Sequence, residues 1–365
     1  MATVHLDGTT LEGGGQLLRL ALSLSSLTRV PVHITSIRGN RGKPGGNAGG
    51  LKPAHLAGAA WLAKATAATT EGMDEKSKEL KFQPAGLEAL ENSISQGRAV
   101  WNDVYENGRL SRRESRITLS TPGAIPLILQ AILPYALFSA SPVPIRINVE
   151  GGTNVSKSPS IEYVTQVLLP LLHTKLGLPK VLTTVHRRGW SVGHIDVGSV
   201  TFDFTPLTKS FKLLPFRFSE RGEVSKVHCS IFAPDIANRR TIINTVRKHL
   251  ANLLPTAEVH IVLDENSGNP KRLYLMLVAE TTSGYLLGRD WLYEGKLNNK
   301  PKRGKKPGPA DQNTEEQTER LVAKVVTDLK GELAHGGCVD EHMQDQLVVF
   351  QALAEYVSLT LSLCD

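Results

Sequence analysis

A short pattern that occurs twice constrains the fold of this chain more than any other feature. In the first copy, an alternating stretch at residues 4–6 is followed by the EGGG run at 12–15 and by apolar residues at helical spacing over 16–28. In the second copy, an alternating strand from Ile145 leads to the EGG run at 150–152 and to another helical pattern. Strands that alternate with helices in this way predict an α/β (α+β) fold with repeated units.

The length and the composition favour a folded protein of about two domains. The chain has 365 residues, of which 41% are hydrophobic and 21% charged, and this excludes a wholly disordered or fibrous chain. Changes in the character of the sequence predict its division. The segments are a large domain over 1–205 with a polar surface excursion at 76–115, a smaller inserted α/β domain over 206–295, a charged linker over 296–317, and the last part of the large domain over 318–365.

The apolar run at residues 123–140 is either a membrane span or a buried helix. It contains Pro126, Gln130 and Pro134 and is barely as long as a bilayer requires, so we interpret it as a helix covered by other layers. The N-terminus has neither a basic nor an apolar signal region, and the three cysteines form no CxxC pair. We therefore expect no signal peptide, no membrane partner, no zinc ribbon and a reducing compartment.

Two segments have a composition that favours binding of anions. Glycines ahead of a helix let a phosphate approach the free N–H groups of its first turn, so EGGGQ at 12–16 predicts either a phosphate cradle or a plain tight turn. The net charge of +7 permits a polyanionic partner, although ordinary surface arginines would give the same count. The basic run at 296–306 is a solvated linker, a nuclear-import signal or a nucleic-acid patch.

A polar helix is predicted to begin after Asp340, which is a good N-cap residue. His342, Asp345 and Gln346 share one face of this helix. One histidine and one aspartate are too few for a metal site, so the pattern alone favours a capped polar face. The residues by themselves thus indicate an α/β protein with a candidate anion site.

Taken together, these segments resemble the RNA 3′-terminal phosphate cyclase family. The resemblance extends in order over most of residues 4–354. It is carried by LDGTTLEGGGQLLRLALSLS, IRGNRGKPGG…LKPAHLAG, TPGAIPLILQAILPYALFSASP, VEGGTNVSKSPSIEYV, SERGEV and HGGCVDEHMQDQLVVFQALA.

The resemblance implies a fold, a reaction and a set of ligands. The fold is a large domain of three units, each pairing two helices with a four-stranded sheet, and a smaller inserted α/β domain. The reaction uses ATP and Mg²⁺ or Mn²⁺ to convert an RNA 3′-terminal phosphate into a 2′,3′-cyclic phosphate. A histidine first receives AMP, the AMP then passes to the RNA 3′-phosphate, and the neighbouring 2′-OH displaces it. RNA 3′ ends are thus the expected partner.

The resemblance also implies roles for individual residues. Glu12 corresponds to the metal-contacting acid, and His342 stands where the family commonly has tyrosine. The loop at 45–50 is longer than usual, and Ala54 replaces a frequent glutamine. The residues expected to contact ATP or its phosphates are Arg19, Arg41, Gln130, Pro159, His342, Asp345 and Gln346.

The family nucleophile has no counterpart in these 365 residues. The family places that histidine in an HxxT segment after the DQL…ALA helix, and here no histidine follows His342. We therefore expect a cyclase by family whose given chain is inactive. The alternative is the branch of catalytically inactive, cyclase-like factors in rRNA processing and ribosome biogenesis. The expected location is the nucleus, in nucleoplasm or nucleolus, with the cytoplasm as a second location.

Overall fold

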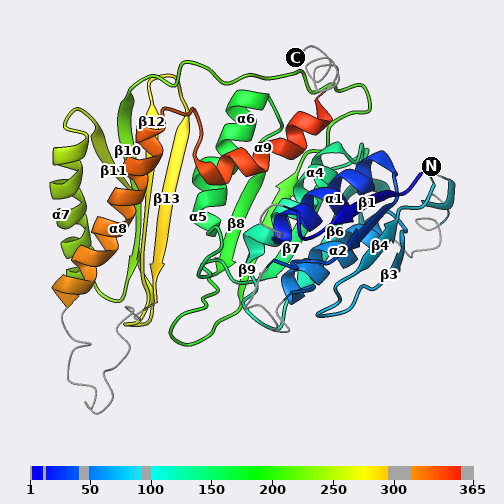
Figure 1. Ribbon diagram of the computed structural model, residues 1–365, viewed down its shortest axis with the longest axis horizontal. Helices are drawn as coiled ribbons and strands as arrows, with labels where there is room; N and C mark the ends of the chain where they lie inside the picture. Colours follow the sequence, from blue (N-terminus) through cyan, green and yellow to red (C-terminus); the bar gives the residue numbers. More distant parts are fainter. Residues whose placement is uncertain are drawn as a thin grey trace.

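The computed structural model describes residues 2–10, 14–40, 49–86, 88–90, 92, 100–294 and 314–354. Three sheets with covering helices form a mixed α/β protein (Figure 1). The first sheet has the order β1-β2-β4-β3, with β1 and β2 parallel and the other pairs antiparallel. Its elements are β1 (Val4–Asp7), α1 (Gly15–Thr28), β2 (Val32–Thr35), α2 (Pro53–Ala65), β3 (Thr69–Glu71) and β4 (Leu80–Gln83).

The second sheet repeats this arrangement and adds β5 at one edge, which gives the order β5-β6-β7-β9-β8. The repeated unit consists of β6, β7, β8 and β9. Again its first two strands, β6 and β7, are parallel, and its fourth strand, β9, lies between β7 and β8. Its elements are β5 (Asn102–Glu106), β6 (Arg109–Thr118), α4 (Ile125–Phe138), β7 (Ile145–Gly151), α5 (Ile161–Tyr163), the π-helical turn η1 (Val164–Leu168), α6 (Leu169–Leu176), β8 (Leu182–Arg187) and β9 (Gly198–Phe204).

Helix α4 is buried nearly all round, as its continuous apolar sequence predicts. It packs against α1 and α2, and Gly58 of α2 brings the two backbones close enough for contact with Ala131. In the part of the chain that the structure describes, no helix has the length and apolar character needed to cross a bilayer.

The third sheet is built differently, with the order β11-β10-β12-β13. Helix α7 begins after Asp235, whose side chain accepts a hydrogen bond from the Asn238 N–H. Helices α7 and α8 pack together on this sheet and share a core with it. The elements are β10 (Val224–Ala233), α7 (Ile236–Leu253), β11 (Glu258–Asn266), β12 (Leu273–Thr281), β13 (Leu286–Tyr293) and α8 (Thr314–Ala334).

Helix α8 bears on the predicted domain division. The division at residues 206–295 stays a prediction, and it assigns α8 to the large domain. In the structure Leu321, Val325 and Leu329 of α8 are buried against the third sheet. The next helix, α9 (Glu341–Leu353), instead contributes Met343 and other residues to the core of the first two sheets. The chain thus passes from one core to the other between α8 and α9.

The segment at 76–115, predicted as a surface excursion, forms strands in the residues that the structure describes. This segment contains β4, β5 and most of β6, and β6 pairs with β7 inside the second sheet. The sequence did not indicate these strands, because their outward side chains are charged and form ion pairs. Arg113 of β6 pairs with Asp103 of β5 at 3.2 Å, and Arg116 of β6 pairs with Glu150 of β7. Such cross-strand ion pairs make a half-exposed strand look like a polar loop.

Candidate functional site

The first turn of α1 is the centre of a cluster of cationic side chains. Its N-cap is Gly14, which has no side chain to bind the N–H groups of the turn. A Cβ atom at Gly15 would lie 2.4 Å from His55 Nε2 and 2.9 Å from Arg19 Nη1. Only glycine therefore lets these two side chains lie directly against the start of the helix.

Four positive or potentially positive groups meet here. The pKa of His55 falls to about 3, first because the ring is buried and then because the charges of Arg19, Arg38 and Lys52 act on it. We call Gly15, Arg19, Arg38, Lys52 and His55 the cationic cradle. Cations around an open helix N-terminus are an arrangement suited to phosphate groups.

His55 is neutral, and its tautomer is set by the backbone. The Lys52 N–H donates to His55 Nδ1 at 3.3 Å at the start of α2, so the ring proton resides on Nε2. That N–H group points toward Gly15. His55 can therefore donate one hydrogen bond to an anion at the α1 terminus.

Arg19 is the main charge of the cradle. Burial lowers the pKa of Arg19 to about 10, and the nearby charge of Asp345 opposes this fall. The guanidinium thus stays charged at neutral pH. Because Asp345 belongs to α9, the last described helix of the chain reaches the cradle formed by the first unit.

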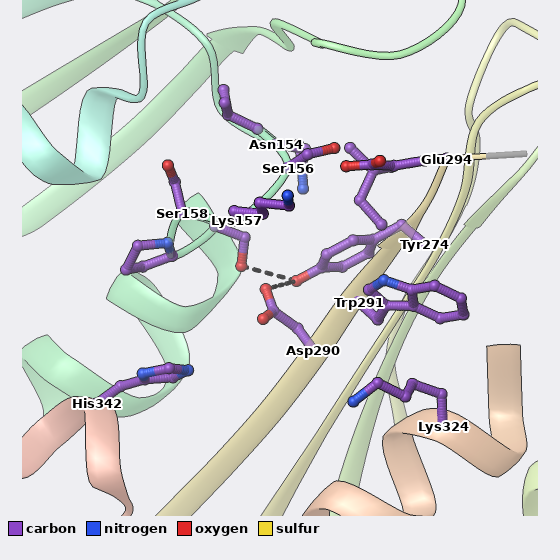
Figure 2. A pocket seen from close by; sticks show the side chains of 14 residues that line it. Asn154, Ser156, Lys157, Ser158, Tyr274, Asp290, Trp291, Glu294, Lys324 and His342 are labelled. Atoms are coloured by element: carbon purple, nitrogen blue, oxygen red, sulfur yellow. Dashed lines mark hydrogen bonds between the residues drawn. The ribbon is translucent and has the colours of Figure 1, made fainter. Parts of the chain in front are cut away.

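A cavity of about 440 Å³ lies beside the first turn of α9 (Figure 2). Its volume is that of a site for a drug-sized ligand or a nucleoside. It is bounded by the loop at 154–160, strands β12 and β13, α8 and α9. The lining residues include Ser156, Lys157, Ser158, Pro159, Ser160, Tyr274, Asp290, Trp291, Glu294, Lys324 and His342.

His342 is held at the wall of this cavity by a network of charges. Arg289 Nη1 donates to His342 Nε2 at 2.9 Å, since a guanidinium can only donate. Arg289 also pairs with Glu332 and, at 3.1 Å, with Glu341. The His342 ring stands edge-on to Tyr163, with 5.9 Å between centroids. An imidazole whose Nε2 accepts from Arg289 thus occupies the wall.

Helix α9 connects the cradle with the cavity. His342 lines the cavity, and Asp345, three residues further along, interacts with Arg19. Three helical residues correspond to a rise of about 4.5 Å, so these two side chains leave α9 about one helical turn apart. An elongated ligand with an anionic end and a flat end could occupy both.

Asp340 fixes the start of α9. Its carboxylate is fully buried and accepts hydrogen bonds from Tyr163 Oη at 2.6 Å, from the Met343 N–H at 2.9 Å and from the Gly288 N–H at 2.8 Å. It therefore ties α5, β13 and α9 together, and the predicted N-cap has a second task in assembling the site.

Replacement of Asp340 by asparagine is expected to lower the free energy of unfolding by about 1–3 kcal/mol, because an amide nitrogen would face one of three buried donors. The matched control is Asp235→Asn, since Asp235 is an exposed N-cap and asparagine caps equally well. Urea unfolding measures both variants. Equal effects on the two would show that Asp340 does no more than cap a helix.

The low pKa of His55 predicts a specific loss of stability in acid. The His55 ring has a pKa near 6.5 in the unfolded chain. Below that pH the ring binds a proton in the unfolded chain but not in the folded chain. From pH 7 to pH 5 this should cost about 2 kcal/mol of unfolding free energy. Urea titrations at both pH values should show a smaller acid loss for His55→Gln. An undiminished acid loss in that variant would contradict the assignment.

The structure brings some of the predicted site residues together. Arg19 and Asp345 interact, while Pro159 and His342 line one cavity. Gln130 is buried on α4, and its Oε1 has no hydrogen-bond partner in the described chain.

The other predicted site residues are Gln346, Glu12 and Arg41. Gln346 is half-buried on α9. The predicted contacts of Glu12 and Arg41 lie outside the residues that the structure describes. Among the described residues, no group of three histidine, cysteine or acidic side chains could hold a metal ion.

Sequence reasoning missed three residues of this region: His55, Tyr274 and Asp290. No local pattern marks them, because His55 sits in an ordinary helix start and the other two sit in apolar strands. The signal that finds them is tertiary: His55 lies against Gly15, and Tyr274 and Asp290 face the cavity.

The fold and the site define a mixed α/β protein with a cationic cradle and a ligand-sized cavity. A family model described as RNA 3'-terminal phosphate cyclase matches residues 10–363. The chain belongs to the RNA 3′-terminal phosphate cyclase family.

Curated relatives named RNA 3'-terminal phosphate cyclase agree with this assignment. The relative from Pyrobaculum neutrophilum is 30% identical over 353 residues, which cover 96% of this chain and 86% of the relative. That from Sulfurisphaera tokodaii is 30% identical over 368 residues, with coverages of 98% and 90%. That from Hyperthermus butylicus is 30% identical over 362 residues, with coverages of 96% and 84%.

Proposed function

We propose that this chain binds ATP along α9, with the triphosphate in the cationic cradle and the nucleoside in the cavity, and that it acts on RNA ending in a 3′-phosphate. One observation supports the proposal: α9 carries both Asp345, whose charge acts on Arg19, and His342, which lines the cavity. The spacing of the two parts suits the two ends of one nucleotide.

The residues of the cradle have distinct tasks in this proposal. Arg19 supplies a fixed charge and a fork of donors for phosphate oxygens. His55 adds the Nε2–H donor without adding charge. Glycine at position 15 keeps both donors against the helix terminus. Together they would orient the phosphates and favour loss of a negatively charged leaving group.

The proposed metal is Mg²⁺ or Mn²⁺, which would neutralise charge on the phosphates. Its expected ligand, Glu12, lies outside the described residues. Asp345, whose charge acts on Arg19, is a second carboxylate that we propose could take part. Oxygen ligands of this kind suit either metal.

The histidines of the site favour binding without self-adenylylation. All eleven histidines lie in the described residues, and His55 and His342 are the two that belong to the cradle or the cavity. The lone pair of His55 already accepts from Lys52, and that of His342 accepts from Arg289. A nucleophile needs a free lone pair in line with the α-phosphate. We therefore propose that the 365-residue chain binds ATP but forms no histidine–AMP bond.

This observation also favours a second candidate function. A chain that binds nucleotide and RNA ends without covalent chemistry would act as a cyclase-like factor in rRNA processing. The two functions differ in one measurable way. A cyclase should gain cyclase activity when an HxxT segment is added after α9, whereas a non-catalytic factor should not.

Binding of RNA ends tests the substrate class. We expect the chain to bind an oligoribonucleotide with a 3′-phosphate more tightly than the same strand with a 3′-OH, and to lose affinity as salt rises. Fluorescence anisotropy at several salt concentrations measures both effects. Equal affinity for the two ends would refute a 3′-phosphate substrate.

The nuclear location remains a proposal that rests on the basic run at 296–306, outside the described residues. Deletion of that run should shift a fluorescent fusion toward the cytoplasm. An unchanged distribution would reject the import role and leave the RNA proposal intact.

A further inference from the structure

Helix α7 concentrates positive charge on the surface of the third-sheet unit. Its sequence, IANRRTIINTVRKHLANL, contains four arginine or lysine residues and no aspartate or glutamate. Helix α8 packs beside it and has five acidic and three basic residues in TEEQTERLVAKVVTDLKGELA. An ordinary solvated helix mixes charges of both signs along its face. The two neighbouring helices instead keep the signs apart, and this marks α7 as a surface for an anionic partner.

Three of the four cations lie on the outward face of α7. Arg240, Arg247 and Lys248 are exposed, and none of them forms a hydrogen bond or an ion pair within the described parts of the chain. Arg239 differs, because it pairs with Asp264 of β11. The opposite face of the helix is buried on the third sheet through Ile242, Val246 and Leu250.

The arrangement of these cations suits a chain of phosphates better than a single phosphate. Arg240 and Arg247 are seven residues apart, so they leave the same side of the helix with a rise of about 10.5 Å between them, and Lys248 follows directly. A single phosphate would need donors that converge on one point. The same face also carries Asn244 and Ala251, which are exposed, short and uncharged. A nucleic-acid backbone can therefore lie close to the helix while the longer side chains reach its phosphate oxygens.

We propose that the outward face of α7 binds the sugar–phosphate backbone of the substrate RNA, on the 5′ side of its terminal nucleotide. The inference rests on the proposed action on RNA 3′ ends and adds the surface that holds the rest of the strand. Figure 1 shows α7 at one edge of the molecule, beside α8 and away from α9. An RNA whose 3′ end lies at the site along α9 therefore reaches α7 only when the strand is long enough. Contacts to phosphates favour length over base sequence.

The experiment measures RNA binding by fluorescence anisotropy on the whole 365-residue chain. The probes are two unstructured oligoribonucleotides with a 3′-phosphate, of about 6 and about 24 nucleotides. We expect the natural chain to bind the longer probe at least about tenfold more tightly. In the triple variant Arg240→Gln, Arg247→Gln, Lys248→Gln this gain should disappear, while affinity for the shorter probe stays. The slope of log K against log salt for the longer probe should fall by about 2, since each lost phosphate contact contributes roughly 0.7.

The matched control is the triple variant Lys64→Gln, Arg109→Gln, Lys180→Gln. These are exposed cations of the first two sheet units, away from α7. Both triple variants remove three positive charges from a chain whose net charge is +7, so a general attraction to RNA would weaken equally in both. Glutamine keeps a high helix propensity, and exposed substitutions change stability little. The control should keep the natural affinity for both probes.

The outcomes separate this inference from the proposed function. Equal losses in the two triple variants, unchanged binding of the longer probe by the α7 variant, or equal affinity of the natural chain for both probes would overturn the role of α7 alone. No binding of either probe by the natural chain would overturn the RNA substrate itself.

Discussion

Replacement of Arg19 by alanine is expected to weaken ATP binding at least about 100-fold, which corresponds to about 2.7 kcal/mol. Arg19 is a half-buried charge beside the α1 terminus, and hydrogen bonds from a charged donor are the strong ones. The removal of Arg19 would also leave Asp345 as an unopposed negative charge beside the phosphates. Calorimetry with ATP measures the loss.

The matched control is Arg239→Ala, which removes an arginine of α7 that pairs with Asp264 away from the cradle. This variant should bind ATP as the natural chain does. Thermal unfolding of both variants shows whether either change acts through stability. ATP affinity in Arg19→Ala within threefold of the natural value would exclude the cradle as the triphosphate site.

The second large effect concerns covalent chemistry. Incubation of the 365-residue chain with α-labelled ATP and Mg²⁺ or Mn²⁺ should leave no label after denaturing electrophoresis. The two histidines at the site have their lone pairs engaged, by Lys52 and by Arg289, and a poised imidazole is required for transfer of AMP. The cyclase from Sulfurisphaera tokodaii serves as the positive control.

A chain extended after α9 by an HxxT segment should become labelled if the protein is a cyclase whose nucleophile is supplied there. Label on the 365-residue chain would contradict the prediction, and His342→Ala and His55→Ala would then identify the acceptor. Absence of label on both chains would favour the non-catalytic factor.

Most helices could be predicted from local pattern. The apolar spacing of α1, the continuous apolar run of α4 and the N-cap Asp340 each have a cause within a few residues of sequence. Strands β5 and β6 could not be predicted, because their exposed charges are balanced by partners on neighbouring strands, such as Asp103 for Arg113 and Glu150 for Arg116. Alternation is visible only when one face of a strand is apolar and the other polar.

The site shows the same limit more sharply. The family resemblance pointed to Arg19, Pro159, His342 and Asp345, and the structure groups them in pairs around α9. His55 depends on contact with a glycine forty residues earlier. The hydrogen bonds from Ser160 to Tyr274 and from Tyr274 to Asp290 join the loop at 154–160 to β12 and β13. These strands lie more than a hundred residues later in the sequence. Such long-range contacts leave no local trace in a single sequence.

The most direct test of the account is a crystal structure of the chain with a non-hydrolysable ATP analogue. The account predicts phosphate oxygens within hydrogen-bond distance of Arg19 and His55, and a base between Pro159 and His342. A nucleotide bound elsewhere, or one whose phosphates lie in the cavity and whose base lies at the α1 terminus, would contradict it.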